Sequence, residues 1–288
     1  MPIKGLTDRK LSFPEIGQIR KGAPKGERKP GQDLKYFRVT FDEQEDKAAE
    51  RFAGIYGDQP AAIRIILPFN DIDRMWDAWL EAYTAGRMVA RSDGENVVYQ
   101  VNTATGEIVV QNGIDVETGQ PRPHPVNNVA GADYQGKDVM YKTSGRLKVI
   151  IPELMRAAYM TVLTTSKNDI ANISAQLKAF KELNDGQIAG IPLYLRRRPK
   201  KVSVPKDDGK RVRKEMWLLS IEADPEWVKA KLQQVKQLAL PDNGMEMLPE
   251  PEVIPEVIVD VEEIDVDEVD DGFDAALDEA GQAELPIN

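Results

Sequence analysis

The chain has 288 residues, of which 38 are basic and 48 are acidic, and its formal net charge is −10. It contains no cysteine, which excludes disulfide bonds and thiolate zinc sites and is typical of a cytoplasmic protein. No run of 18 apolar residues is present, and the first residues lack the apolar stretch of a signal peptide. We therefore expect a cytoplasmic globular protein that does not enter a membrane.

The negative charge is concentrated at one end of the chain. Residues 241–288 contain seventeen acidic residues and no basic one, which leaves 38 basic and 31 acidic residues in 1–240. This terminal segment is punctuated by prolines and then alternates acidic with aliphatic residues, a composition typical of disorder. The sequence thus predicts three parts: an extended basic N-terminal arm (1–33), a folded body (34–240) and an acidic disordered tail (241–288).

The first part of the body is predicted to contain two strands and a helix. The segments "YFRVTF" (36–41) and "AIRIILPF" (62–69) are rich in β-branched and aromatic residues, which favours strands. Asn70 is a candidate helix cap, and apolar residues then recur at helical spacing up to Gly86. The predicted core-facing stripe of this helix comprises Ile72, Met75, Trp76, Trp79, Leu80 and Tyr83.

The rest of the body is predicted to mix strands with two further helices. Turn residues at 92–94 and 104–106 divide residues 87–113 into a three-stranded meander. A long polar loop follows at 113–137, and then a strand, a short helix and a strand within 145–166. One helix is expected over 168–183, with Ile170, Ile173, Leu177 and Phe180 inward. Another is expected from Asp224 to Leu238, with a buried face of Trp227, Leu232 and Val235.

This order of elements predicts an α+β fold with a mainly antiparallel sheet and three or four amphipathic helices. An OB-like barrel is the alternative arrangement, because short curved strands joined by long loops can close into such a barrel.

The strongest functional signal is a predicted basic hairpin formed by strands at 191–204 and 209–223. Ten basic residues lie between Arg196 and Lys214, and alternate residues such as Arg196 and Arg198 should share a face. Arginine binds phosphate oxygens in a bidentate manner, and flanking aromatic rings can stack on bases. We therefore predict a nucleic-acid- or anion-binding surface composed of Arg196, Arg197, Arg198, Lys200, Lys201, Lys210, Arg211, Arg213, Lys214, Tyr194 and Trp217. A hairpin whose charges are merely solvated is the alternative.

The chain offers little for catalysis. His124 is the only histidine and lies in a proline-rich loop, where an exposed ring is expected, so histidine-based triads and zinc sites lack partners. The segment "GADYQGKD" (131–138) fits most of a phosphate-binding loop, but Asp138 replaces the Ser or Thr that would bind magnesium. The sequence therefore predicts a protein that is not an enzyme, with no catalytic residue, metal site or cofactor.

The acidic tail suggests one specific function for the basic surface. A tethered polyanion has a high local concentration and can compete with nucleic acid for the hairpin, or it can recruit a basic partner. Bacterial and phage single-strand-binding proteins share this layout, although the tail here ends in "AELPIN" rather than in an acidic-Pro-Phe tip. One hypothesis is therefore a protein of phage replication or recombination that binds single-stranded DNA.

A second hypothesis comes from longer segments of sequence. These are "MPIKGLTDRKLSFPEIGQIRKGAPKG", "DLKYFRV", "LPFNDIDRMWDAWLEAYTAGRMVARSDG", "GRLKVIIPEL" and "GIPLYLRRRP". Over roughly residues 1–240 the chain resembles phage and prophage proteins related to the recombination directionality factors of large serine integrases. The resemblance implies a protein without a reaction of its own that binds a serine integrase and switches it from integration to excision. It implies no particular integrase-contact residue.

Overall fold

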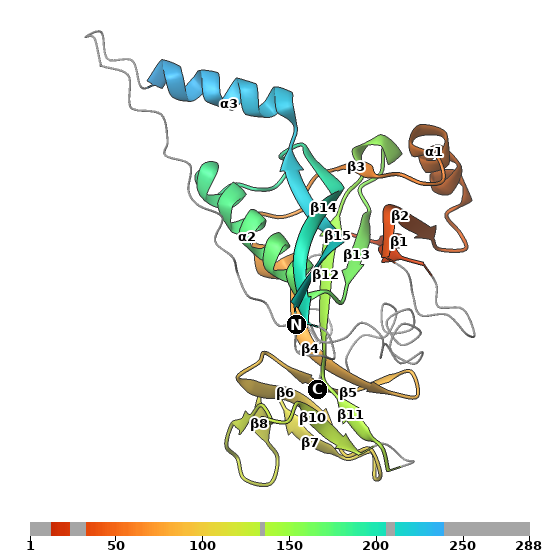
Figure 1. Cartoon of the computed structure of the whole chain (residues 1–288), viewed down its shortest axis with the longest axis vertical. Coiled ribbons are helices and arrows are strands. Elements are labelled where there is room, and N and C mark those ends of the chain that lie inside the picture. Colours follow the sequence, from red (N-terminus) through yellow and green to blue (C-terminus); the bar gives the residue numbers. More distant parts are fainter. Residues whose placement is uncertain (1–12, 24–32, 133–135, 206–210, 239–288) are drawn as a thin grey trace, which may run out of the picture.

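The computed structural model describes residues 13–23, 33–132, 136–205 and 211–238. Figure 1 shows an upper part that holds helices α1, α2 and α3 and a lower lobe built from strands. In chain order the elements, with η marking short 3-10 helices, are β1 (Glu15–Gly22), β2 (Asp33–Phe41), α1 (Asp46–Tyr56), β3 (Ala62–Ile65), η1 (Ile72–Arg74), β4 (Trp76–Thr84), β5 (Arg87–Ser92), β6 (Asn96–Val101), β7 (Ile108–Gln111), β8 (Ile114–Asp115), β9 (Arg122–Pro123), β10 (Val129–Ala132), β11 (Asp138–Met140), β12 (Lys142–Val149), η2 (Pro152–Leu154), β13 (Tyr159–Thr164), α2 (Lys167–Leu183), β14 (Leu193–Pro205), β15 (Arg211–Ala223) and α3 (Pro225–Leu238).

Ten of the strands that the structure describes form one large sheet. Its order is β2-β1-β13-β12-β4-β5-β6-β7-β8, with β9 paired to β6. The pairing of β1 with β13 is parallel, and the other recorded pairings in this sheet are antiparallel. The α+β fold with a mainly antiparallel sheet is therefore confirmed. Among the described strands the order is open, with β2 and β8 at opposite edges, so the sheet is not an OB-like barrel.

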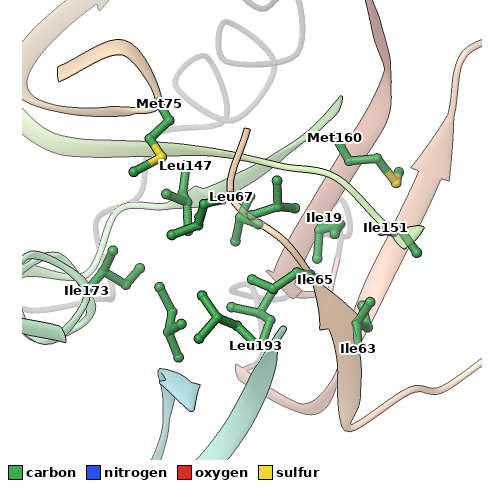
Figure 2. Packing of buried hydrophobic residues seen from close by; sticks show 14 of the residues in the cluster. Ile19, Ile63, Ile65, Leu67, Met75, Leu147, Ile151, Met160, Ile173 and Leu193 are labelled. Carbon is green, nitrogen blue, oxygen red and sulfur yellow. The ribbon is translucent and has the colours of Figure 1, made fainter. Parts of the chain in front are cut away.

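The main core lies between this sheet and a smaller one. The small sheet has the order β15-β14-β3, and α2 packs beside β15. Figure 2 shows aliphatic side chains from both sheets and from α2 meeting in one cluster, among them Ile19, Leu147 and Met160 of the large sheet, Ile65 and Leu193 of the small sheet, and Ile173 of α2. Full burial of each such side chain stabilises the fold by about 1.5–3 kcal/mol.

The lower lobe has a separate core of smaller side chains. Strands β4 to β7, the β10–β11 hairpin and the residue that follows β11 form this core. Its buried residues are Ala82, Val89, Ala90, Val97, Val110, Ala130, Val139 and Tyr141. The loop expected over 113–137 therefore contains three short strands instead. His124 lies within it and is partly buried, with Nδ1 2.9 Å from Ser92 Oγ and Nε2 3.2 Å from Asn128 Oδ1. The prediction of an exposed ring was wrong, because both ring nitrogens contact polar partners.

The helix predicted after Asn70 is also wrong. A single 3-10 turn, η1, is followed by β4, which pairs with β12 on one side and β5 on the other. Trp76 packs in the main core as expected, whereas Trp79 is partly buried on the opposite face of the strand. Asn70 caps no helix; its Oδ1 accepts hydrogen bonds from the backbone N–H groups of Ile188 and Ala189.

The remaining predicted helices are present. In α2, Ser166 is the N-cap, Ile173 and Leu177 are buried, and Ile170 and Phe180 pack against the core. In α3, Trp227 packs against the core but Leu232 is 57% exposed, so the predicted buried face was wrong there. The side chain of Val235 lies outside the described residues.

Helix α1 and strand β1 were also not predicted. Strand β1 lies inside the segment expected to be an extended arm, where it occupies the interior of the large sheet. Among the described residues, no helix has the length and apolar character needed to span a membrane. The acidic tail lies outside the described residues.

Candidate anion-binding hairpin

The predicted hairpin is confirmed as β14 and β15, which pair without interruption from Leu193–Ala223 to Pro205–Arg211. Figure 1 shows the two strands side by side next to α2. At the base of the hairpin Leu193, Leu195 and Leu219 are fully buried in the main core. Its base is therefore part of the folded body, and its basic residues fall into groups with different environments.

Arg197 is an interior residue, with a fully buried side chain. Its Nη2 lies 2.6 Å from Asp33 Oδ1, and Nε and Nη2 donate to the carbonyl oxygen of Leu34 at 3.1 and 2.9 Å. Burial lowers the pKa of the Arg197 guanidinium, and the carboxylates of Asp33 and Asp169 oppose that shift. Because this guanidinium faces the protein, Arg197 does not belong to a surface for external anions.

Arg196 and Arg198 project on the same face, as alternate residues should, and they converge on one carboxylate. Arg198 donates to both Glu222 oxygens at 2.5 Å, and Arg196 Nε lies 3.2 Å from Glu222 Oε2. The hydrogen bonds from Arg198 lower the pKa of Glu222. The Arg196 guanidinium also lies 4.8 Å from the centre of the Tyr194 ring. These two arginines are thus partly neutralised within the hairpin.

The aromatic residues Tyr194 and Trp217 are both only partly exposed. Trp217 shares a face with the buried Arg197, and its ring centre lies 5.6 Å from Lys35 Nζ of β2. Its backbone N–H donates to Asp33 Oδ2 at 3.1 Å. Tyr194 therefore lies at the base of the hairpin, whereas Trp217 lies opposite Pro199, where the contacts with the body end.

The outer edge of β15 is covered by a row of polar side chains from α2. Asp169 Oδ1 and Gln176 Oε1 accept the backbone N–H groups of Leu219 and Ile221, and Asn172 Nδ2 donates to the Leu219 carbonyl. Asp169, Asn172 and Gln176 recur at spacings of three and four, so they share one helix face. They satisfy the backbone groups that a neighbouring strand would otherwise bind.

The outer half of the hairpin is where its basic residues are free to meet solvent. Lys200, Lys201, Arg213 and Lys214 are all exposed. Arg211 is placed in β15 opposite Pro205, but its side chain is not described, and Lys210 lies outside the described residues. The predicted eleven-residue surface is therefore divided. Arg197 is held by the body, Arg196 and Arg198 pair with Glu222, and Lys200, Lys201, Arg213 and Lys214 are exposed.

Sequence reasoning missed the two acidic partners, Asp33 and Glu222. Glu222 stands directly opposite Tyr194 and so shares the face of Arg196 and Arg198, which the hairpin register would have revealed. Asp33 is 164 residues away from Arg197 in the chain. Its role depends on a tertiary contact for which the local sequence carries no signal.

A second cluster of charges connects the lower lobe to the main core. Glu81 of β4 is fully buried and binds Arg91 of β5 and Arg146 of β12, with shortest distances of 2.7 and 2.6 Å. Burial by itself would raise the pKa of Glu81, but Arg146 and Arg91 outweigh it and hold the pKa below its usual value. Burial and Glu81 raise the pKa of neighbouring Tyr83 to about 12. All these groups bind one another, which identifies the cluster as structural.

Comparison with known proteins places this fold in a family. No curated protein and no solved structure matches the chain significantly. Residues 16–224 match the model of the Gp3-like family, and this match covers β1 to β15 together with the whole hairpin. The chain therefore belongs to the Gp3-like family, whose members are described as recombination directionality factor-like.

Proposed function

We propose that this protein is a recombination directionality factor that binds a large serine integrase and switches it from integration to excision. The observation that carries the proposal is the family match over residues 16–224, which includes both cores and the hairpin. The match makes the chain a phage recombination-related protein, and integrase binding is the partnership which that family implies. Its site of action would be the cytoplasm, where phage DNA recombines.

We further propose that the protein acts by binding alone. Both ring nitrogens of its only histidine, His124, have polar partners: Nδ1 contacts Ser92 Oγ of β5, and Nε2 contacts Asn128 Oδ1. The buried carboxylates Glu81 and Asp169 are likewise occupied, Glu81 by two arginines and Asp169 by Lys21 and by the backbone of Leu219. Groups that are paired in this way stabilise the fold and are poor candidates for acid–base chemistry.

Direct binding is the first test of this proposal. The full chain would be mixed with a cognate large serine integrase, and the mass of the complex would be measured by light scattering in the absence of DNA. We expect a defined complex. Failure to bind at micromolar concentrations, or turnover of DNA or nucleotide by the protein alone, would argue against a directionality factor.

The alternative function, single-stranded DNA binding by the hairpin with the tail as competitor, has less support. The aromatic rings proposed to stack on bases are only partly exposed, and Arg197 faces the core. Lys200, Lys201, Arg213 and Lys214 in the outer half of the hairpin are nevertheless exposed.

A further inference from the structure

The lower lobe ends in a short hairpin whose outward face is aliphatic. Figure 1 shows β7 and β8 at the end of the lobe that lies away from α1, α2 and α3. Val110 of β7 and Asp115 of β8 are paired and both are buried, so the neighbouring Ile114 projects from the other face of the hairpin. Val116 donates its backbone N–H to the Val109 carbonyl at 2.9 Å, which extends this pairing by one residue. Val116 and Ile114 therefore share the outward face.

Aliphatic side chains at this end of the lobe are exposed to solvent. Val116 is 61% exposed, Ile114 is 42% exposed, and Ile108 at the start of β7 is 39% exposed. Exposed apolar side chains that gather in one place mark interaction sites, whereas single ones need no explanation. Glu107 precedes Ile108 in the chain and Glu117 follows Val116, and both carboxylates are exposed. We call these five residues the lobe-end patch.

The backbone of the hairpin is held in place on both sides of the patch. Asn112 and Gly113 have φ angles of 51° and 82°, so β7 and β8 are joined by a two-residue turn that matches the twist of paired strands. The buried Asp115 carboxylate holds the next turn, because Oδ1 accepts the backbone N–H of Glu117 at 3.0 Å and Oδ2 lies 2.5 Å from Arg122 Nη2. A surface that is ordered before association loses little conformational entropy on binding. The hairpin is therefore suited to present the patch to a macromolecular partner.

The charge around the patch is opposite in sign to the net charge of the body. Residues 101–121 contain three acidic residues and no basic one, whereas residues 1–240 as a whole contain 38 basic and 31 acidic residues. A second copy of the patch, the acidic tail and a nucleic acid all carry negative charge, so each would place like charges next to Glu107 and Glu117. The sign of the charge therefore selects a basic partner.

We propose that the lobe-end patch is the surface by which this protein docks onto the serine integrase. The inference rests on the function proposed above and adds to it the surface that makes the contact. An integrase binds duplex DNA, and a protein neutralises phosphates with lysine and arginine side chains. Its contact with the patch combines aliphatic side chains with flanking Lys or Arg residues, which complement the patch in both polarity and charge. By contrast, the exposed Lys200 and Lys201 of the β14–β15 hairpin have the same sign of charge as a DNA-binding partner.

The first pair of variants tests the two exposed carboxylates. The patch variant is Glu107→Lys with Glu117→Lys, and the control is Glu50→Lys with Glu182→Lys, which makes the same change at exposed positions of α1 and α2. Binding of the full chain to a cognate large serine integrase is measured without DNA by biolayer interferometry, and folding by circular dichroism. We expect the patch variant to lose about ten-fold or more in affinity and the control to change by less than about two-fold.

The second pair tests the aliphatic side chains. Ile114→Ser with Val116→Ser removes apolar contact area from the patch, and Met155→Ser with Leu183→Ser makes a matched change at exposed positions of the upper part. We again expect a loss of about ten-fold for the patch and a change below about two-fold for the control. The loss caused by the serine variant should persist at high salt, whereas the effect of charge reversal should shrink because salt screens it.

Failure of this inference can be distinguished from failure of the proposed function. If the wild type binds the integrase and both patch variants bind as tightly, or lose no more than their controls, the inference is wrong and the proposed function stands. No binding by the wild type contradicts the proposed function and, with it, this inference. If the serine variant fails to fold, the carboxylate variant decides, because it changes only exposed side chains. A dimer of the wild-type chain that the patch variants dissociate would overturn the inference and assign the patch to a second copy.

Discussion

At the scale of single residues, the basic hairpin contains two kinds of arginine with different energetic roles. Arg197 is buried beside Asp33, whereas Arg198 is half exposed beside Glu222. Removing one partner of a buried ion pair costs about 3–5 kcal/mol, because the other charge is left without compensation. Exposed pairs contribute about 0–1 kcal/mol. The two ion pairs of β14 should thus differ several-fold in their contribution to the free energy of unfolding.

We predict that Asp33→Ala lowers the free energy of unfolding by about 3 kcal/mol, because the Arg197 guanidinium then stays buried without its carboxylate partner. Glu222→Ala is the matched control, with an expected loss below about 1 kcal/mol. Urea denaturation of both variants measures the difference. Equal losses would show that Arg197 finds other compensation once Asp33 is removed.

A second prediction concerns Glu81, whose pKa is held below its usual value by Arg146 and Arg91. A carboxyl with a lowered pKa in the folded state stabilises the protein above its unfolded pKa of about 4.3, and that stability disappears as pH falls through the folded pKa. Glu81→Gln should therefore cost about 3 kcal/mol at pH 7 and progressively less below about pH 4. A cost that does not depend on pH would contradict this assignment.

At the scale of elements, the polar row on α2 substitutes for a neighbouring strand along β15. We predict that the double variant Asn172→Ala, Gln176→Ala leaves the Leu219 carbonyl and the Ile221 amide without partners, at about 1–3 kcal/mol for each group. Hydrogen exchange should accelerate at Ile221 and its neighbours in β15. Lys178→Ala, on the exposed face of the same helix, is the control and should change neither measurement. Unchanged protection of Ile221 would show that α2 is not needed to cover this edge.

The elements also show where sequence patterns suffice and where they fail. The hairpin, the 87–113 meander and α2 were predicted because turn residues and periodicity are local signals. The segment that contains β4 was predicted as a helix because the strand carries apolar residues on both faces. The spacing of Met75, Trp76, Trp79, Leu80 and Tyr83 then resembles that of a helix. The segment forms a strand because it pairs with β12, more than sixty residues away in sequence, and this tertiary pairing overrides local propensity.

The same limit applies to the candidate site. The density of positive charge is visible in the sequence, but which cations are free depends on Asp33 and Glu222, which contact the arginines only in the fold. The predicted set therefore contained both the exposed lysines and the buried Arg197. Side-chain exposure, which separates them, is a tertiary property.

At the scale of the whole molecule, the charge asymmetry between residues 1–240 and the acidic tail remains the most distinctive feature. The tail has no basic residue and contains a proline cluster at 249–255. We predict that truncation after Pro241 leaves the thermal unfolding temperature nearly unchanged, because such a composition buries little apolar surface. If the hairpin binds single-stranded DNA, as in the alternative function, the truncation should also raise that affinity at low salt because a tethered competitor is removed. The gain should shrink as salt screens the charges. A large loss of thermal stability would instead assign the tail a place in the fold.

The function proposed for this protein is to set the direction of recombination by a serine integrase. The most direct measurement is a reaction of purified integrase with and without the full chain. The plasmids carry either the two substrate sites of integration (attP and attB) or its two product sites (attL and attR). We predict that the protein switches on recombination of attL with attR and suppresses recombination of attP with attB, at concentrations close to that of the integrase. Recombination of attP with attB at full rate and none of attL with attR, with excess protein present, would contradict the account.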